Sequence, residues 1–271
     1  MTTTSLLNAW PAGSAVSLLA LDEGAMVTVA SEGDRSQIFD WASISKLAVA
    51  IAVGVECDWK YLSLDLPVGP ANSTVAHLLS HSSGLGIDAG ALTQPVGQRR
   101  IYTTYGYDVL IERIVGERPA IDWLKDRLLT PLGMNDVTTE GSIASGLRGS
   151  LASAEALATA WLRGDLLGLE TFARMKSIHL PEIEGVVPGF GTFTPCPWGL
   201  GPEVKGTKQH WMGSEWPASS YGHFGKSGSL VLVDPEAQVL VVALSPEPFG
   251  PWAVSLWPEW TNEVHRRLVN R

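Results

Sequence analysis

Short apolar runs near both ends of the chain limit the folds that are open to it. Two runs near the N-terminus are separated by Asp22-Glu23-Gly24, and two near the C-terminus are joined through Asp234-Pro235-Glu236. Turn residues between short apolar runs are typical of a β-hairpin. The four predicted strands are residues 15–21, 26–30, 228–233 and 239–244. The two ends of the chain are therefore expected to build one α/β part of the fold together.

The segment between these hairpins differs in character. From about residue 58 to residue 216 it has helical periodicity interrupted by loops, and we expect helices over 106–115, 121–129 and 154–167. A last helix is expected over 252–269, packed on the sheet and kinked at Pro258. No repeat or linker divides the 271 residues. The pattern thus predicts a helical part inserted into an α/β part.

The composition excludes several classes of function. The chain has 19 Lys and Arg against 28 Asp and Glu, so its formal charge of -9 disfavours a nucleic-acid partner and a membrane surface. Its longest apolar stretch, residues 47–55, is about half of the ~20 residues that span a bilayer. The first basic residue is Arg35, so no export signal is visible and a cytoplasmic protein is expected. Cys57 and Cys196 lack metal-ligand spacing and are expected to be reduced thiols.

One serine and one lysine have a spacing that suits nucleophilic catalysis. An almost entirely apolar segment follows Lys46, and as a helix it would be buried on every side. Ser43 would open this helix. The i to i+3 spacing puts both side chains on one helix face. Burial lowers the pKa of a lysine from its reference value of ~10.4, so Lys46 would accept the Ser43 proton near neutral pH. N–H groups at the helix start would bind the oxyanion of an attacked carbonyl.

Taken alone, this spacing is more often that of a helix-capping serine with a lysine that reaches solvent, so its context decides. Four segments supply that context, and they are residues 38–46 (IFDWASISK), 75–85 (VAHLLSHSSGL), 102–107 (YTTYGY) and 222–225 (GHFG). In this order they resemble the motifs of class C β-lactamases and related esterases and D-amino peptidases. The second is similar to the HLLSHTSGL signature of the β-lactamase and penicillin-binding-protein superfamily, its most specific mark.

The resemblance covers roughly residues 15–244 and implies a fold. It implies one catalytic domain over residues 1–271, of α/β (α+β) class and β-lactamase/transpeptidase-like. An antiparallel β-sheet flanked by N- and C-terminal helices would come from about residues 1–57 and 217–271. An inserted helical subdomain would come from about residues 58–216.

The resemblance also implies roles for single residues. Ser43 would be the nucleophile that forms an acyl-enzyme, Lys46 its base or proton relay, and Tyr102 a phenol or phenolate that passes the proton to the leaving group. We expect the neighbouring lysine to lower the pKa of Tyr102. His223 would line the cleft on an edge strand, and the N–H of Lys226 would be the second oxyanion donor.

The third motif leaves two registers open. The run 223–225 (HFG) resembles a His-x-Gly element, whereas 226–228 (KSG) would match a Lys-Thr-Gly element. We prefer the first, because Gly228 then falls where the family often repeats a glycine. In that register Gly225 would let the substrate approach the strand backbone closely.

Two positions depart from the β-lactamase pattern, with Thr104 in place of Asn and His223 in place of Lys. We expect His223 to titrate near its reference pKa of ~6.5. Threonine and such a mostly neutral histidine offer less to an acylamino group and a carboxylate. We therefore predict an esterase-like hydrolase whose partner is a small-molecule ester, amide or β-lactam, with no cofactor and no metal. A β-lactamase, a D-alanyl carboxypeptidase or D-amino peptidase, and a catalytically weak binding module stay open as alternatives, and no oligomeric state is predicted.

Two further features have a structural and a functional interpretation. His77 and His81 at i and i+4 lack the glutamate of a metalloprotease helix and a third ligand, so we predict structural histidines and not a zinc site. Residues 181–217 are rich in Gly, Pro and Trp and too aperiodic for a helix. They are interpreted either as a cleft-lining loop with an apolar acyl site or as packing under a long surface loop.

Overall fold

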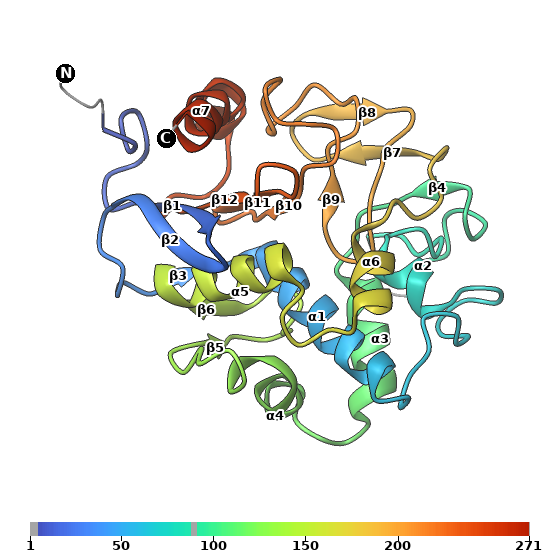
Figure 1. Cartoon of the computed structure of the whole chain (residues 1–271). Coiled ribbons are helices and arrows are strands. Elements are labelled where there is room, and N and C mark those ends of the chain that lie inside the picture. Colours follow the sequence, from blue (N-terminus) through green and yellow to red (C-terminus); the bar gives the residue numbers. More distant parts are fainter. Residues whose placement is uncertain (1–4, 88–90, 271) are drawn as a thin grey trace.

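A six-stranded antiparallel sheet lies at the centre of the fold (Figure 1). The computed structural model describes residues 5–87 and 91–270. In spatial order the strands are β2 (Ala25–Glu32), β1 (Ala15–Asp22), β12 (Val239–Leu244), β11 (Leu230–Asp234), β10 (Tyr221–Phe224) and β9 (Glu203–Val204). Both predicted hairpins are confirmed, and they join where β1 pairs with β12. The two ends of the chain thus form one sheet.

Local turn chemistry explains why these segments form hairpins. Glu23 and Gly24 have φ values of 46° and 85°, as a tight two-residue hairpin turn requires. In the other hairpin the Asp234 carboxylate accepts hydrogen bonds from the N–H groups of Glu236 (2.8 Å) and Ala237 (3.0 Å). An aspartate that bonds the backbone two and three residues ahead stabilises a turn.

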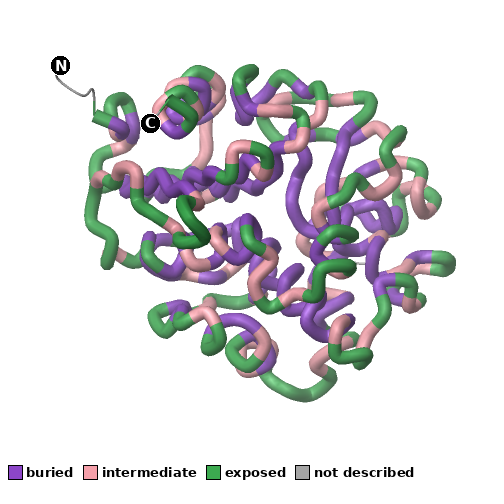
Figure 2. The backbone as a smooth tube through the Cα atoms, viewed as in Figure 1, coloured by how far each residue is buried: buried purple, intermediate pink, exposed green. Residues whose placement is uncertain are grey.

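Helices cover both faces of the sheet, so its central strands are buried on both sides (Figures 1 and 2). In β12, Leu240, Val242 and Leu244 belong to one apolar cluster, and the alternate residues belong to a second one. The first cluster includes α1 (Ser45–Asp58) and α5 (Leu151–Arg163), and the second includes α7 (Pro251–Val269). Because side chains alternate along a strand, one strand supplies both cores. The predicted fold class is confirmed.

Smaller elements surround these three layers. The other helices are α2 (Val75–Leu79), α3 (Tyr105–Val115), α4 (Ala120–Leu124) and α6 (Leu169–Lys176). Two three-stranded sheets consist of β3 (Phe39–Asp40), β6 (Leu147–Gly149) and β5 (Thr138–Thr139), and of β4 (Arg99–Arg100), β7 (Glu184–Val187) and β8 (Gly191–Phe193). Both α5 and β9 come from the segment 58–216, yet they pack against or pair with the six-stranded sheet. Among the described residues, no helix has the length and apolar character of a membrane span.

The observed helix ends differ from the predicted ones where a capping residue fixes the first or last turn. The helix expected over 154–167 is α5, which begins three residues earlier because Ser150 Oγ accepts a hydrogen bond from Ser153 N (3.2 Å). It ends at Gly164, whose φ of 77° is the left-handed C-cap conformation. The helix expected over 121–129 is divided into α4 and a π-helical turn, Lys125–Leu129.

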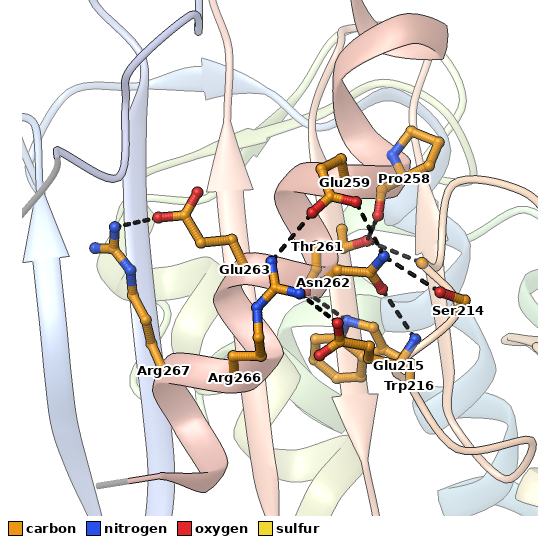
Figure 3. Close-up of polar contacts among 11 residues, drawn as sticks. Ser214, Glu215, Trp216, Pro258, Glu259, Thr261, Asn262, Glu263, Arg266 and Arg267 are labelled. Carbon is orange, nitrogen blue, oxygen red and sulfur yellow. Dashed lines mark hydrogen bonds and ion pairs between the residues drawn. The ribbon is translucent and has the colours of Figure 1, made fainter.

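Hydrogen bonds tie the C-terminal helix to the loop that precedes β10 (Figure 3). Trp216 Nε1 donates to the Thr261 carbonyl (2.8 Å), and the N–H of Glu215 donates to Asn262 Oδ1 (2.9 Å). The helix α7 continues across Pro258, whose carbonyl accepts from Thr261 Oγ1 (3.1 Å). These contacts hold the entry to β10 in place, and β10 carries one wall of the site described next.

Candidate active site

Ser43 lies on a 3₁₀ turn, Ala42–Ile44, directly before α1. The prediction that Ser43 opens the helix is wrong by two residues, since α1 begins at Ser45. The buried character predicted for this helix is confirmed, whereas Ser43 itself is partly exposed. Ala42 has a φ of 46°, a left-handed conformation that strains a residue with a side chain. The Ser43 hydroxyl is thus presented on a strained turn and stays accessible.

Lys46 reaches back from α1 to this turn. Its Nζ lies 3.3 Å from Ser43 Oγ, 3.0 Å from Thr104 Oγ1 and 3.2 Å from the carbonyl oxygen of Ala144. The side chain is fully buried. The structure thus brings together three of the predicted site residues, Ser43, Lys46 and Thr104.

Burial controls the charge of Lys46. It lowers the pKa of the amine to about 7, Asp108 opposes this shift, and the nearby cation Lys226 adds to it. The predicted direction is confirmed, and its physical reason is the loss of hydration of the ammonium form. Near neutral pH a substantial fraction of Lys46 is therefore a neutral amine.

Tyr102 and His223 meet beside Ser43, in the lining of one cavity. Tyr102 Oη lies 3.5 Å from His223 Nε2, at the limit of a hydrogen bond. Burial raises the pKa of Tyr102, and a hydrogen bond with Ser43 only partly opposes this. The predicted lowering of this pKa is therefore wrong. The prediction relied on an adjacent ammonium to lower the pKa. Desolvation of the phenolate raises the pKa by more than the contacts lower it, so Tyr102 stays a phenol.

His223 lies on β10 and is 3% exposed. Its Nδ1 lies 2.7 Å from the carbonyl oxygen of Phe224, which requires the proton on Nδ1 and leaves Nε2 as an acceptor. Burial, and secondarily Lys46, lowers the pKa of His223 to about 4. The expectation that this histidine titrates near its reference pKa of ~6.5 is wrong. The expectation that His223 lies on an edge strand is wrong, because β9 pairs with Tyr221 and Gly222 of β10 and is itself the edge strand. His223 lies beyond this pairing.

Gly225 begins the turn between β10 and β11. Its N–H donates to the Ser229 carbonyl (2.9 Å). A Cβ atom on Gly225 would lie 2.5 Å from the Trp41 carbonyl oxygen and 3.0 Å from Ala42 Cβ. Glycine at 225 therefore allows β10 to approach the Ser43 turn closely, and the predicted close approach of a substrate to this backbone stays a prediction. Residues 226–228 lie in the turn that follows β10. The strand residue that contacts Tyr102 is His223, so the structure favours the 223–225 register.

A cavity of about 110 Å³ lies in front of Ser43. The other residues that line it are Tyr102, Pro188, Trp198, His223, Phe224, Lys226 and Phe249. Among the described residues, the backbone N–H groups of Ser43 and Lys226 have no hydrogen-bond partner. Two free N–H groups beside a nucleophile can bind the oxygen of a carbonyl that becomes negative. The aromatic walls exclude water and favour an apolar ligand.

Sequence reasoning missed a buried ion cluster behind Trp198. Glu203 Oε1 lies 2.7 Å from Lys208 Nζ and 2.9 Å from His210 Nε2, and all three residues are buried. Burial alone would raise the pKa of Glu203, but Lys208 and His210 hold it below its usual range. Lys208 also donates to the carbonyl of Pro197 (3.1 Å), the residue before Trp198. The cluster therefore supports the cavity wall formed by Trp198. The segment that contains the cluster has no periodicity, so the sequence did not indicate it.

The two histidines of the second motif serve different elements. His77 Nδ1 accepts from the N–H of Thr74 (3.3 Å) in the capping box of α2. His81 packs against Tyr102 with ring centroids 4.5 Å apart, and its Nδ1 accepts from the N–H of Thr103 (3.3 Å). Within the described ranges, no group of three or more His, Cys, Asp and Glu could hold a metal ion. His81 thus supports Tyr102, a role that the sequence did not indicate.

Comparisons with known proteins agree with this geometry. The Beta-lactamase family model matches residues 14–258. The chain is 33% identical to a structure named a beta-lactamase (Mb2281c) from Mycobacterium bovis, with a TM-score of 0.91 over 97% of this chain and 98% of that chain. No curated protein matches the chain significantly.

Two more distant structures share the fold alone. A D-amino acid amidase from Ochrobactrum anthropi has a TM-score of 0.72 and 17% identity over 95% of this chain and 92% of its own. EstCE1, described as a hydrolase with promiscuous acyltransferase activity, has a TM-score of 0.68 and 16% identity over 94% of this chain and 93% of its own. From the family match and the 33% identity it follows that this chain belongs to the β-lactamase family, whose members are generally serine hydrolases.

Proposed function

We propose that this chain is a serine hydrolase with esterase-like activity on small acyl substrates, acting through an acyl-enzyme on Ser43. The observation that carries the proposal is the contact of Lys46 Nζ with Ser43 Oγ at 3.3 Å. A buried amine whose pKa is about 7 is a base matched to neutral pH. The partly exposed serine hydroxyl beside it faces a cavity with two free N–H groups.

The contacts of Lys46 suit a base. A neutral amine has two N–H groups and one lone pair. Thr104 Oγ1 and the Ala144 carbonyl, at 3.0 and 3.2 Å, accept the two N–H groups. The lone pair is then left for the Ser43 hydroxyl, which donates its proton to Lys46.

The reaction would follow in two halves. Ser43 Oγ bonds to the carbonyl carbon while its proton moves to Lys46, and the N–H groups of Ser43 and Lys226 bind the oxyanion. The bond to the leaving group then breaks, and the leaving oxygen takes a proton that the Lys46 ammonium supplies directly or through the Tyr102 phenol. Water attacks the acyl-enzyme by the reverse proton path, which releases the acid and restores Ser43.

One contact and one charge state support an ester substrate over a β-lactam. Thr104 Oγ1 already accepts from Lys46, so it offers little to an acylamino group. His223 is neutral near pH 7 and offers no charge to a carboxylate. β-Lactam hydrolysis is the second candidate, and what favours it is the 33% identity to the structure named a beta-lactamase.

Labelling with a fluorescent fluorophosphonate and with fluorescent penicillin tests the proposal. The matched variants are Ser43→Ala and Ser45→Ala. Ser45 Oγ accepts from the N–H of Leu147 (3.1 Å) inside the core, so Ser45→Ala should lower stability by about 1–3 kcal/mol and keep labelling. Ser43→Ala should lose labelling and p-nitrophenyl acetate turnover while it stays folded. Lys46→Arg should also be nearly inactive, because arginine keeps its proton.

The outcomes separate the candidates. Labelling at Ser43 by the fluorophosphonate alone supports an esterase, and labelling by both probes together with nitrocefin turnover supports the second candidate. If neither probe labels the folded protein, the catalytically weak binding module is the alternative that remains. Ester turnover that survives in a folded Ser43→Ala variant would overturn the proposal.

A further inference from the structure

A second cavity adjoins the one at Ser43, and we propose that it binds a neutral, apolar alkyl or aryl group of the substrate. This inference rests on the proposed function, since it specifies what that active site accepts. The second cavity measures about 550 Å³, against about 110 Å³ in front of Ser43. Tyr102 and Pro188 line both, so a group that enters the second cavity lies beside Tyr102 of the candidate active site. Its volume lies within the ~300–1,000 Å³ of small-molecule sites.

Apolar side chains from two segments form its walls. One segment follows β4 and contributes Ile101, and the other is β7, which pairs with β4 in parallel (Figure 1). Along β7, Gly185 and Val187 are buried, and a Cβ atom on Gly185 would lie 2.8 Å from Arg100 Cβ. Val186 therefore points the other way, where it lines the cavity and stays 44% exposed. An exposed valine on a cavity wall favours an apolar ligand, because contact with one removes it from water.

The cationic groups of this cavity already have partners. Arg99 forms an ion pair with Glu184 at 2.8 Å. Arg100 donates to the carbonyls of Cys196 and His179, each at 2.8 Å, and to that of Ser80. Arg99 is thus already neutralised by a carboxylate and Arg100 is held by backbone carbonyls, so an anion gains less here than beside an unpaired cation. An alkyl or aryl group leaves these contacts intact. The remaining polar lining consists of uncharged side chains, Thr93, Gln94, Thr103 and Thr104.

Chain-length preference tests the inference. We compare kcat/KM for p-nitrophenyl octanoate with that for the acetate, and for octyl acetate with that for methyl acetate, so that the acyl and the alcohol side are examined separately. Each buried methylene is expected to contribute about fourfold. Burial of about two or three of the added methylenes then gives a preference of about 10- to 100-fold for the long chain in at least one series. A terminal carboxylate on that chain should lower kcat/KM.

Variants connect this preference to the cavity. Val186→Trp fills the cavity and Val186→Ser makes its wall polar, so both should lower the long-to-short ratio by about tenfold. Val27→Trp is the matched control, because Val27 is a half-exposed valine of similar exposure (36%) on β2, at the far edge of the six-stranded sheet. It should leave the ratio unchanged. Melting curves identify any variant that is unfolded. If Val186→Trp does not fold, Val186→Ser still tests the inference.

Failure of the inference and failure of the proposed function are distinguishable. If acetate turnover depends on Ser43 but both series are flat, or if both Val186 variants keep the ratio of the parent, the apolar subsite is wrong and the hydrolase proposal stands. A higher kcat/KM for the chain with a terminal carboxylate would overturn the neutral character of the subsite. If no ester is turned over and Ser43 is not labelled, the proposed function itself fails.

Discussion

The Lys46 amine lies closer to the hydroxyl oxygen of Thr104, at 3.0 Å, than to that of Ser43, at 3.3 Å. Thr104 therefore orients the amine that contacts the candidate nucleophile. In the sequence, Thr104 is only a departure from the asparagine of the β-lactamase pattern. The contact with Lys46 gives Thr104 a role in positioning the base, and this role can be tested.

Thr104→Val should lower kcat/KM for p-nitrophenyl acetate by about tenfold or more, because a hydrogen bond to a charged group contributes about 1.5–3 kcal/mol. Thr104→Ser keeps the hydroxyl and is the matched control, with activity close to that of the parent. Steady-state kinetics check both. Equal activity of the valine variant and the parent would show that Lys46 needs no help from Thr104.

The activity should depend on pH through Lys46. Because the neutral amine is the base, kcat/KM should rise with pH, with a midpoint near the Lys46 pKa of about 7. Asp108 raises this pKa, so Asp108→Asn should move the midpoint to lower pH, and Lys226→Gln should move it to higher pH. Asp126→Asn, a surface carboxylate paired with Arg118, is the control. Shifts of equal sign in the first two variants would contradict this assignment.

Lys46 should destabilise the fold that it serves. The unfolded lysine keeps its proton up to its reference pKa of ~10.4, whereas the folded one loses it near pH 7. Between these values the unfolded state binds more protons, so the contribution of Lys46 to stability rises with pH from about 7 to about 10.

The variant Lys46→Met should abolish activity, raise the free energy of unfolding at neutral pH by about 0.5–2 kcal/mol and remove that slope. Denaturant unfolding at several pH values measures the difference between parent and variant. A methionine variant that is less stable and has an unchanged slope would contradict the burial argument.

His223 should not act as a pH switch for substrate choice. With its pKa lowered to about 4 by burial, it stays neutral between about pH 5.5 and 8. The ratio of kcat/KM for a carboxylate-bearing ester over its neutral analogue should therefore be flat across this range, not grow as pH falls. Paired kinetics with both esters check this. A ratio that increases at low pH in the parent but not in His223→Asn would show that the histidine does titrate there.

Local relationships could be predicted from the sequence. The β1–β2 and β11–β12 hairpins follow from turn residues between apolar runs, and Lys46 contacts Ser43 because it lies three positions later, one turn along the continuous 3₁₀ and α-helical backbone. The order of four motifs indicated the fold class and the family. The hairpins and the Ser43–Lys46 contact depend on neighbours in the chain, so local backbone geometry determines them.

Relationships that depend on packing required the tertiary structure. Tyr102 and His223 are 121 residues apart in sequence and meet only because β10 ends beside the segment after β4. The pKa values of both were predicted incorrectly, since desolvation depends on which side chains surround a group and no local pattern specifies them. The ion cluster around Glu203 and the cavity lined by Ile101 and Val186 have the same origin. They exist where segments without periodicity pack against one another, and there the tertiary structure alone decides the environment of each charge.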